Sequence, residues 1–179
     1  PFNGLIPALR SKAAEMAIAA ITPTPERQKV VIFSNVYYEA KSTLVTRPGN
    51  EITELPALRD LKVGVKPGTV HEKLVRSVVS DPVPLDRSSD MLQELKGRRI
   101  DVAVMDEAIA KRYNPIATNV VMTTLNNPEE PAGAAIAFPP GSRLQPKVNA
   151  VLGRMEQSGK LNELILKWFD DYICPIPES

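Results

Sequence analysis

Residues 61–75, Leu-Lys-Val-Gly-Val-Lys-Pro-Gly-Thr-Val-His-Glu-Lys-Leu-Val, decide the fold class. The alternating valines within 61–66 are typical of a short strand. The breaker residues at 67–69 then predict a turn, and a helix is expected to run on through Val75. Strand, tight turn and helix in this order form the first half of a βαβ unit.

The same order repeats downstream. A short strand is expected at 82–85 and a helix at 88–96, with Gly97 placed to end it. Another strand is expected at 100–105 and another helix at 106–112. Strands that alternate with helices at this rhythm predict parallel βαβ units and an α/β fold.

Both ends of the chain carry further signals. The apolar run at 16–21 predicts a strand buried on both faces. Thr24 followed by Pro25 is a strong signal for the start of a helix. Apolar spacing predicts the remaining elements, which are strands at 30–33, 42–46 and 134–138 and helices at 2–12, 144–155 and 161–168.

Two breaker-rich stretches, 47–50 and 126–131, predict that the chain crosses twice between two lobes. Lobe 1 is then expected to be discontinuous. The predicted composition is residues 1–40 and 132–179 for lobe 1 and residues 41–131 for lobe 2.

Composition excludes several classes of protein. With 22 Lys and Arg against 21 Asp and Glu, the net charge is +1 and no basic stripe is present, so no nucleic-acid partner is expected. No apolar run approaches the roughly 20 residues that span a bilayer, and no leader pattern is visible. Cys174 and His71 are the single cysteine and histidine. An internal disulfide and an ordinary zinc site are therefore excluded, although carboxylates could bind other ions, and no cofactor is expected.

Several stretches, in order along the chain, resemble the motifs of one known family. They are Phe2–Leu9 (FNGLIPAL), Ala20–Arg27 (AITPTPER) with Phe33–Tyr38 (FSNVYY), Val63–Thr69 (VGVKPGT), Asp101–Asp106 (DVAVMD), Ile136–Pro139, Lys147–Asn149 and Lys167–Phe169. The chain resembles the type II periplasmic solute-binding proteins for polar amino acids, bacterial extracellular solute-binding protein family 3. Among its members, the glutamine-binding proteins look most similar.

This resemblance implies a two-lobe, periplasmic-binding-protein-like fold of type II and a binding role, not an enzyme. A polar L-amino acid would bind in a cleft between the lobes, which would close around it. The closed form would dock on the permease subunits of an ABC transporter. The implied location is periplasmic or extracellular after removal of a signal peptide, with a lipid anchor as an alternative form of attachment.

The resemblance begins part-way through the family's first lobe. We therefore expect the family's N-terminal strand–helix–strand segment to be absent and lobe 1 to be incomplete. Lobe 1 would then expose a sheet edge and apolar surface. Proteolysis or truncation, a second chain that supplies the missing strands, and a divergent, rebuilt lobe all remain open.

The resemblance assigns the ligand's α-carboxylate to Arg27 and Thr69. The planar guanidinium of Arg27 suits bidentate carboxylate binding, and the backbone N–H of Thr69 follows Gly68 at the start of a helix. Without the resemblance, Arg27 would be read as a surface residue and Thr69 as an ordinary N-cap.

The resemblance assigns the remaining ligand contacts to residues of both lobes. Asp106 would bind the ammonium from the end of a strand, a common place for ligands in α/β sheets. Thr22 would contribute its hydroxyl and N–H, Ala20 its carbonyl, and Phe2 an apolar contact with the ligand's aliphatic part. Read alone, Asp106 is a helix N-cap and Phe2 a core residue.

Selectivity is expected to depend on Lys66, Val70, His71 and Met105. Lys66 matches a lysine of the glutamine-binding members, where it reaches the side-chain amide. Its charge would disfavour cationic ligands such as arginine. We therefore expect glutamine as the ligand, with glutamate or aspartate next, although Met105 replaces a polar residue of the glutamine pattern.

Two other functions compete with this reading. Some relatives of the same fold dehydrate small carboxylates, and Asp106, Glu107 and His71 are the nearby candidates for a general acid or base. A sensor or interaction module that no longer binds a ligand is the other alternative.

Overall fold

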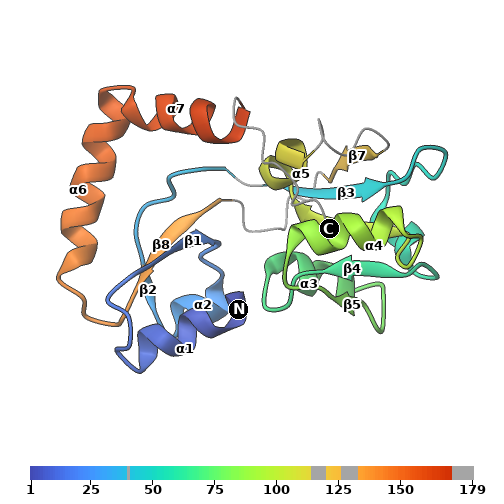
Figure 1. Cartoon of the computed structure of the whole chain (residues 1–179). Coiled ribbons are helices and arrows are strands. Elements are labelled where there is room, and N and C mark those ends of the chain that lie inside the picture. The colour runs from blue at the N-terminus through green and yellow to red at the C-terminus, as the bar shows by residue number, and fades with distance from the viewer. Residues whose placement is uncertain (40, 114–119, 126–132, 171–179) are drawn as a thin grey trace. The chain divides into compact units, whose positions relative to one another are not determined.

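The computed structural model describes residues 1–39, 41–113, 120–125 and 133–170 (Figure 1). Predictions about Cys174 and the 126–131 stretch lie outside these residues. The chain divides into two compact units: unit 1 is Pro1–Ala40 with Pro128–Trp168, and unit 2 is Lys41–Asn127 with Phe169–Ser179. That the units are the lobes of a ligand-binding protein stays a prediction.

Unit 2 contains the predicted strand–helix alternation around one sheet. Its elements are β3 (Ser42–Thr46), a 3-10 turn η2 (Leu55–Leu58), β4 (Val63–Val65), α3 (Val70–Arg76), β5 (Val83–Pro84), α4 (Ser88–Lys96), β6 (Val102–Asp106), α5 (Glu107–Tyr113) and β7 (Val121–Thr124).

The sheet of unit 2 is mixed, with strand order β5-β4-β6-β3-β7. β4 is parallel to β5 and to β6, as predicted, since α3 and α4 each return the chain to the same end of the sheet. β3 runs antiparallel to β6 and β7. β7 was not predicted, because its four residues, Val-Met-Thr-Thr, show no clear hydrophobic period.

Each face of this sheet has its own core, because successive strand residues point to opposite faces. On one face Leu44 and Val104 pack with Val75 of α3. On the other face Met105 packs with Met91 and the neighbouring apolar residues of α4. Full burial of one such side chain contributes about 1.5–3 kcal/mol.

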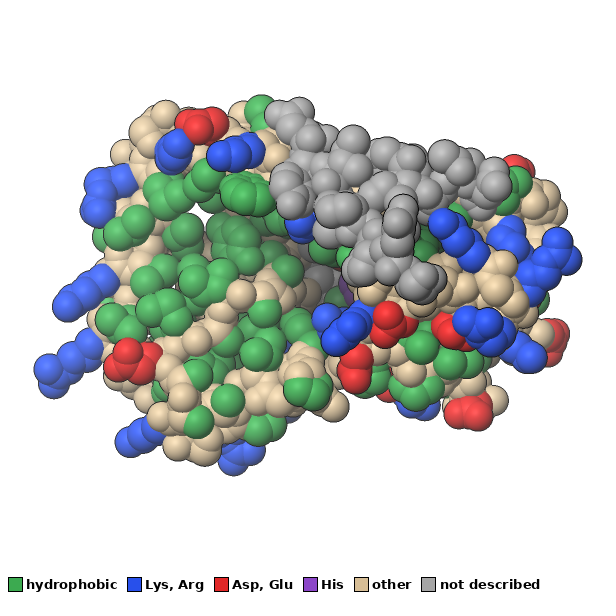
Figure 2. Space-filling view, viewed as in Figure 1, with side chains coloured by type: hydrophobic (Ala, Val, Ile, Leu, Met, Phe, Trp, Pro, Cys, Tyr) green, Lys and Arg blue, Asp and Glu red, His purple; other side chains and the backbone are tan. Residues whose placement is uncertain are grey.

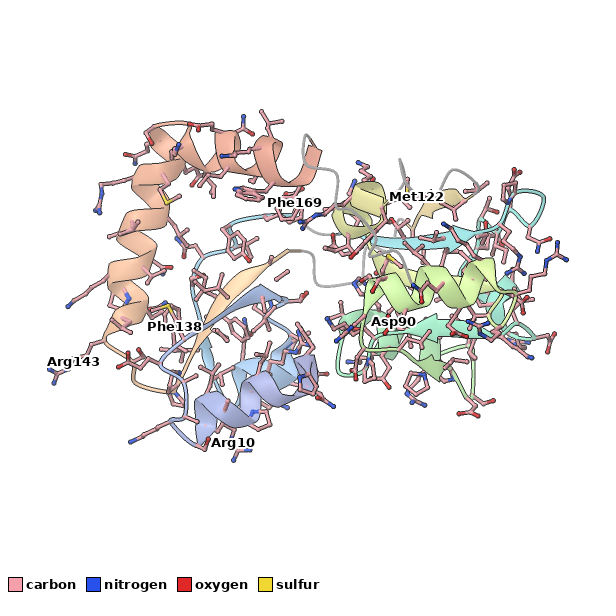
Figure 3. The ribbon with its side chains drawn as sticks, in the orientation of Figure 1. Arg10, Asp90, Met122, Phe138, Arg143 and Phe169 are labelled. Carbon is pink, nitrogen blue, oxygen red and sulfur yellow. The ribbon has the colours of Figure 1, made fainter. Side chains whose placement is uncertain are left out.

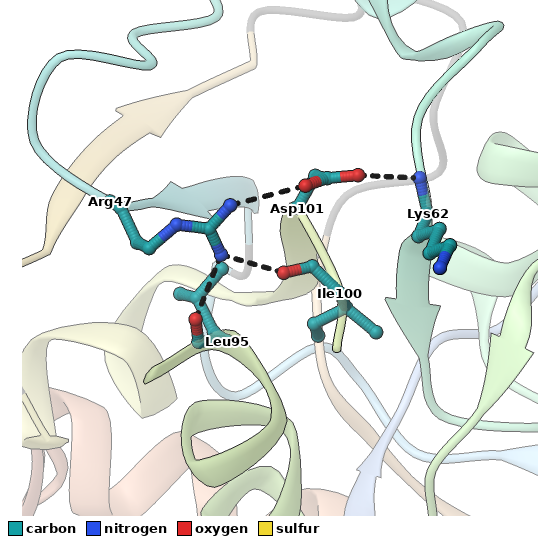
Figure 4. Close-up of polar contacts among 5 residues, drawn as sticks. All are labelled: Arg47, Lys62, Leu95, Ile100 and Asp101. Atoms are coloured by element: carbon teal, nitrogen blue, oxygen red, sulfur yellow. Dashed lines mark hydrogen bonds and ion pairs between the residues drawn. The ribbon is translucent and has the colours of Figure 1, made fainter. Parts of the chain in front are cut away.

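Arg47, immediately after β3, ties one end of the sheet together (Figure 4). Its Nη1 donates to the carbonyls of Leu95, at 2.8 Å, and Ile100, at 2.7 Å, and its Nη2 pairs with Asp101 Oδ1 at 3.1 Å. Asp101 Oδ2 in turn accepts the backbone N–H of Lys62. One guanidinium therefore joins β3 to the end of α4 and the starts of β4 and β6.

Unit 1 is built around a smaller sheet. Its elements are η1 (Phe2–Gly4), α1 (Leu5–Arg10), β1 (Ala17–Ile21), α2 (Pro25–Gln28), β2 (Ile32–Phe33), β8 (Ala135–Phe138), α6 (Leu144–Gln157), α7 (Lys160–Ile165) and a π-helical stretch η3 (Leu166–Asp170).

The strand order in unit 1 is β1-β8-β2, and both outer strands are antiparallel to β8. β1 and β2 therefore run in the same direction, but β8 separates them. Phe138 of β8 is fully buried (Figure 3), and Leu9 and Ile21 belong to the core cluster beside the sheet.

The prediction that the 16–21 run is buried on both faces is wrong. Ile18 is 63% exposed and Met16 38% exposed. Among the described residues β1 pairs only with β8, so it lies at the edge of the sheet, and only Ala17 and Ile21 are fully covered.

All the exposed large hydrophobic residues of the described chain belong to unit 1, where green side chains gather in Figure 2. α6 has no buried residue at all and is fastened by polar bonds, Gln145 Nε2 to the Phe33 carbonyl and the Asn35 N–H to Asn149 Oδ1. The exposed residues are Met16, Ile18, Val36, Val151, Leu166 and Trp168.

Replacement of Arg47 should weaken the fold. Arg47→Ala removes the side-chain donor that bonds to the carbonyls of Leu95 and Ile100, and the side chain of Arg47 is only 19% exposed. We expect the free energy of unfolding to fall by about 2–3 kcal/mol in urea titration. Arg59→Ala, at an exposed arginine of the same unit, is the control and should change it by less than about 0.5 kcal/mol. Equal effects of the two substitutions would contradict the role given to Arg47.

Candidate functional site

Three of the predicted ligand residues come together in unit 1. Arg27 Nη1 donates to the carbonyl of Thr22 at 2.8 Å, and its guanidinium carbon lies 5.7 Å from the centre of the Phe2 ring. Thr22 is only 5% exposed. The five N–H donors of an arginine allow Arg27 to hold Thr22 and an acceptor group at the same time.

The local sequence explains how Arg27 is placed. Thr24 caps α2, because its Oγ1 accepts the N–H of Arg27 at 3.3 Å, and Pro25 occupies the first helical position as predicted. Burial lowers the pKa of Arg27, and the nearby charge of Glu26 opposes this shift. The guanidinium stays charged, because arginine keeps its proton in proteins.

Ala20 stands in a strained backbone conformation. Its φ is +49°, a region that favours glycine, and the pairing of β1 with β8 is irregular at this point, with Ala17 opposite Ala137 and Ile21 opposite Ala135. Such a conformation costs about 1–2 kcal/mol for a residue with a Cβ atom. Strain of this kind is often found where a backbone group has to face a ligand.

The other predicted residues gather at the edge of the unit 2 sheet that is formed by the carboxyl ends of its parallel strands. β4 and β6 are parallel, so both end at this edge, where Lys66 follows β4 and Asp106 closes β6. The antiparallel strand β3 begins there, with Ser42 directly opposite Asp106. Leu125 also donates its N–H to the Ser42 carbonyl, so the chain enters and leaves this sheet at the same edge.

The hydroxyl of Thr69 is already engaged. Thr69 Oγ1 donates to the Lys66 carbonyl at 2.7 Å and accepts the N–H of Glu72 at 3.2 Å, which makes Thr69 the N-cap of α3. Glu72 Oε2 accepts the N–H of Gly68 at 2.7 Å, and its Oε1 accepts Arg76 Nε. An incoming carboxylate would therefore meet the backbone N–H groups that open α3, since the first N–H groups of a helix have no partner within it.

Glu72 was not among the predicted site residues. The spacing Thr69-x-x-Glu72 is that of a capping box, and this signal was available in the sequence.

Asp106 is the N-cap that its sequence position suggested. Its Oδ1 accepts the N–H of Ala108 at 2.9 Å at the start of α5. This bond fixes the carboxylate at the sheet edge and is compatible with a second role in binding an ammonium group.

Glu107 is poorly suited to acid catalysis. Burial raises its pKa, but the hydrogen bond and charge of Lys111, with the hydrogen bond of Thr124 and the charge of Lys41, hold the pKa below its ordinary value. The carboxylate therefore stays ionised and paired with Lys111, at 3.0 Å, which argues against the dehydratase alternative.

The selectivity candidates are placed differently from one another. Met105 is 3% exposed and packs in the core on the α4 face, the opposite face from the Asp106 side chain. Val70 is half-buried, and Lys66 lies half-buried at the end of β4. His71 Nδ1 lies 2.7 Å from the Oγ of Ser42, a residue that the sequence analysis did not single out.

Sequence comparison identifies the family. Residues 1–171 match the family described as "Bacterial extracellular solute-binding proteins, family 3". The chain belongs to this family. It is a solute-binding protein and not an enzyme, as predicted, and the periplasmic-binding-protein fold of type II is confirmed by solved structures such as the substrate-binding protein of an amino acid ABC transporter, with 32% identity and a TM-score of 0.87 over 94% of this chain and 76% of that chain.

The relatives correct the finer prediction. The "Arginine-binding extracellular protein ArtP" of Bacillus subtilis is 36% identical over 173 residues, 94% of this chain and 68% of that protein. The glutamine-binding protein GlnH of the same species is only 28% identical, over 93% of this chain and 62% of that protein. Of these two proteins, the one named for arginine is the more similar to this chain.

Similar solved structures include a complex with arginine and a complex with glutamine. An ancestral arginine-binding protein bound to arginine is 37% identical with a TM-score of 0.83, covering 94% of this chain and 77% of that one. The ancestral protein bound to glutamine is 38% identical with a TM-score of 0.82, covering 94% of this chain and 76% of that one.

No helix in the described ranges is long and apolar enough to cross a membrane.

Two substitutions of Asp106 should separate its capping role from its charge. Asp106→Ala removes the acceptor for the Ala108 N–H and should lower the free energy of unfolding by about 1 kcal/mol. Asp106→Asn keeps an acceptor oxygen and should be within a few tenths of a kcal/mol of the parent. Both are measured by urea unfolding without added amino acid. An Asn variant as unstable as the Ala variant would show that capping does not set the stability contribution.

Proposed function

We propose that this chain binds a polar L-α-amino acid and delivers it to an ABC transporter from outside the cytoplasmic membrane. The observation that carries the proposal is the cluster in unit 1, where the half-buried, charged Arg27 is held by Thr22 beside Phe2. A partly buried guanidinium of this kind suits a carboxylate, because charge-assisted, bidentate bonds are strong where water is scarce.

The proposed roles follow the chemistry of each group. Arg27 and the N–H groups of Thr69 and Val70 bind the ligand carboxylate, and Asp106 binds its ammonium. The carbonyl of Ala20 is a second acceptor for the ammonium. Thr22 orients Arg27 through its carbonyl, and Phe2 contacts the aliphatic part of the ligand. The transporter permease and the location outside the membrane belong to the same proposal.

Arginine is the first candidate ligand, because the Bacillus subtilis relative named for arginine shares more of this sequence than the one named for glutamine. Glutamine is the second candidate, and Lys66 is the observation in its favour. Two positive charges about 5 Å apart repel each other by roughly 3 kcal/mol at an effective dielectric constant near 20. An amide oxygen would accept a hydrogen bond from the same ammonium group.

Titration calorimetry with L-arginine, L-glutamine, L-glutamate and L-histidine tests the proposal, with Arg27→Ala as the decisive variant. Loss of the guanidinium should weaken binding of the preferred amino acid about 100-fold, since truncation of one partner of a buried charge pair costs about 2–5 kcal/mol. Gln28→Ala, an exposed neighbour on α2, is the matched control and should leave the dissociation constant unchanged. An Arg27→Ala variant with the affinity of the parent would refute the assignment, and a folded parent that binds none of the four would favour the sensor alternative.

Lys66 should set the preference between the two candidates. Lys66→Gln removes the positive charge while it keeps a polar side chain of similar length. We expect the affinity for arginine to rise at least tenfold relative to glutamine, as repulsion is removed. Lys62→Gln, at an exposed lysine before β4, is the control. An unchanged ratio of the two dissociation constants in Lys66→Gln would show that the lysine does not face the ligand side chain.

A further inference from the structure

The single histidine of the chain bonds to a buried serine beside the candidate site. His71 Nδ1 and Ser42 Oγ lie 2.7 Å apart, and Ser42 is only 1% exposed. His71 belongs to the first turn of α3, two residues after Thr69. Ser42 is the strand partner of Asp106. The bond therefore connects the turn that carries Thr69 with the strand pair that carries Asp106.

A polar pair is not needed here for packing. Ser42 lies two residues before Leu44, on the sheet face that α3 covers with apolar residues. A buried hydroxyl costs free energy unless it is hydrogen-bonded, whereas an apolar residue would fill the same place without a partner. The pair does gain one property that apolar packing lacks, namely a directional bond of defined length between α3 and β3.

We propose that His71 and Ser42 are positioning residues that set the spacing between the N–H groups at Thr69 and the carboxylate of Asp106. This inference rests on the proposed function, in which those two groups bind the carboxylate and the ammonium of one amino acid. His71 then acts through Ser42 and not by direct contact with the ligand side chain.

Fixed spacing matters because an α-amino acid carries both charged groups on one carbon atom. A β-homo-amino acid places one more methylene between them. A site with rigid spacing rejects the longer analogue, and a site whose α3 turn can shift against β6 accepts it more readily. The ratio of the two affinities therefore reports the spacing, while a general loss of stability lowers both affinities alike.

The test measures dissociation constants for L-arginine and L-β-homoarginine by calorimetry, and for L-glutamine and L-β-homoglutamine if glutamine is the amino acid bound. In Ser42→Ala and in His71→Leu, the preference for the α-amino acid should fall three- to tenfold, the range expected for one hydrogen bond. The double variant should lose no more than either single one. His71→Asn, which can still bond to Ser42, should retain most of the preference.

Ser77→Ala is the matched control, because it also removes a serine hydroxyl bond of 2.7 Å, to the Leu74 carbonyl, at the far end of the same helix. An unchanged ratio in both Ser42→Ala and His71→Leu, or an equal fall in Ser77→Ala, would overturn the proposal. A parent protein that binds neither amino acid refutes the proposed function instead. The positioning role is then decided by amide hydrogen exchange: Ser42→Ala should speed exchange in the first turn of α3 and at Ala108 more than Ser77→Ala does, and equal exchange would overturn it.

Discussion

The antiparallel pairing of β3 with β6 is the constraint on which the candidate site of unit 2 depends. Its register places Ser42 opposite Asp106 at one edge and Thr46 opposite Val102 at the other. A shift by one residue would exchange the two faces, so Asp106 would point into the α4 core and Met105 toward α3. The pairing is secured at the far edge by Arg47, whose guanidinium bonds to two carbonyls and to Asp101. Structural and functional residues thus occupy opposite ends of the same strand pair.

The two units differ in how well their apolar residues are covered. In unit 2 each sheet face has a closed core, whereas unit 1 leaves Ile18 on β1 and Val151 on α6 exposed. Arg27 is nevertheless held in place in unit 1, because its hydrogen bonds with Thr22 and Thr24 are local in sequence. The contacts around Arg27 therefore do not depend on the covering of α6 or of the β1 edge. Because these hydrogen bonds are local, the motif around residues 20–27 can be recognised in the sequence.

Most elements were predictable from the sequence, and the errors have physical causes. The βα units of residues 61–112 gave clear periodicity and caps, and the Thr24-Pro25 start was correct. The burial of β1 was overestimated, because an apolar run cannot reveal whether a strand has neighbours on both sides. β7 was missed because its four residues, Val-Met-Thr-Thr, show no clear period. Within the site, the family resemblance suggested Arg27 and Asp106, but only the strand register could bring in Ser42, and only the face of β6 could place Met105 in the core.

Overall similarity and ligand preference depend on different parts of the chain. Identity to the arginine-binding relative is measured over 173 residues, far more than the few that surround a bound ligand. Preference between a guanidinium and an amide depends on the few charges that surround the ligand side chain. The repulsion between a single lysine and a guanidinium is about as large, in free energy, as a large difference in affinity between two ligands. Lys66 is fixed at the sheet edge because its carbonyl accepts the Thr69 hydroxyl in the turn that starts α3. In the proposed site, the charge of this one side chain favours an uncharged ligand side chain over a guanidinium, whereas the relative named for arginine suggests the opposite preference.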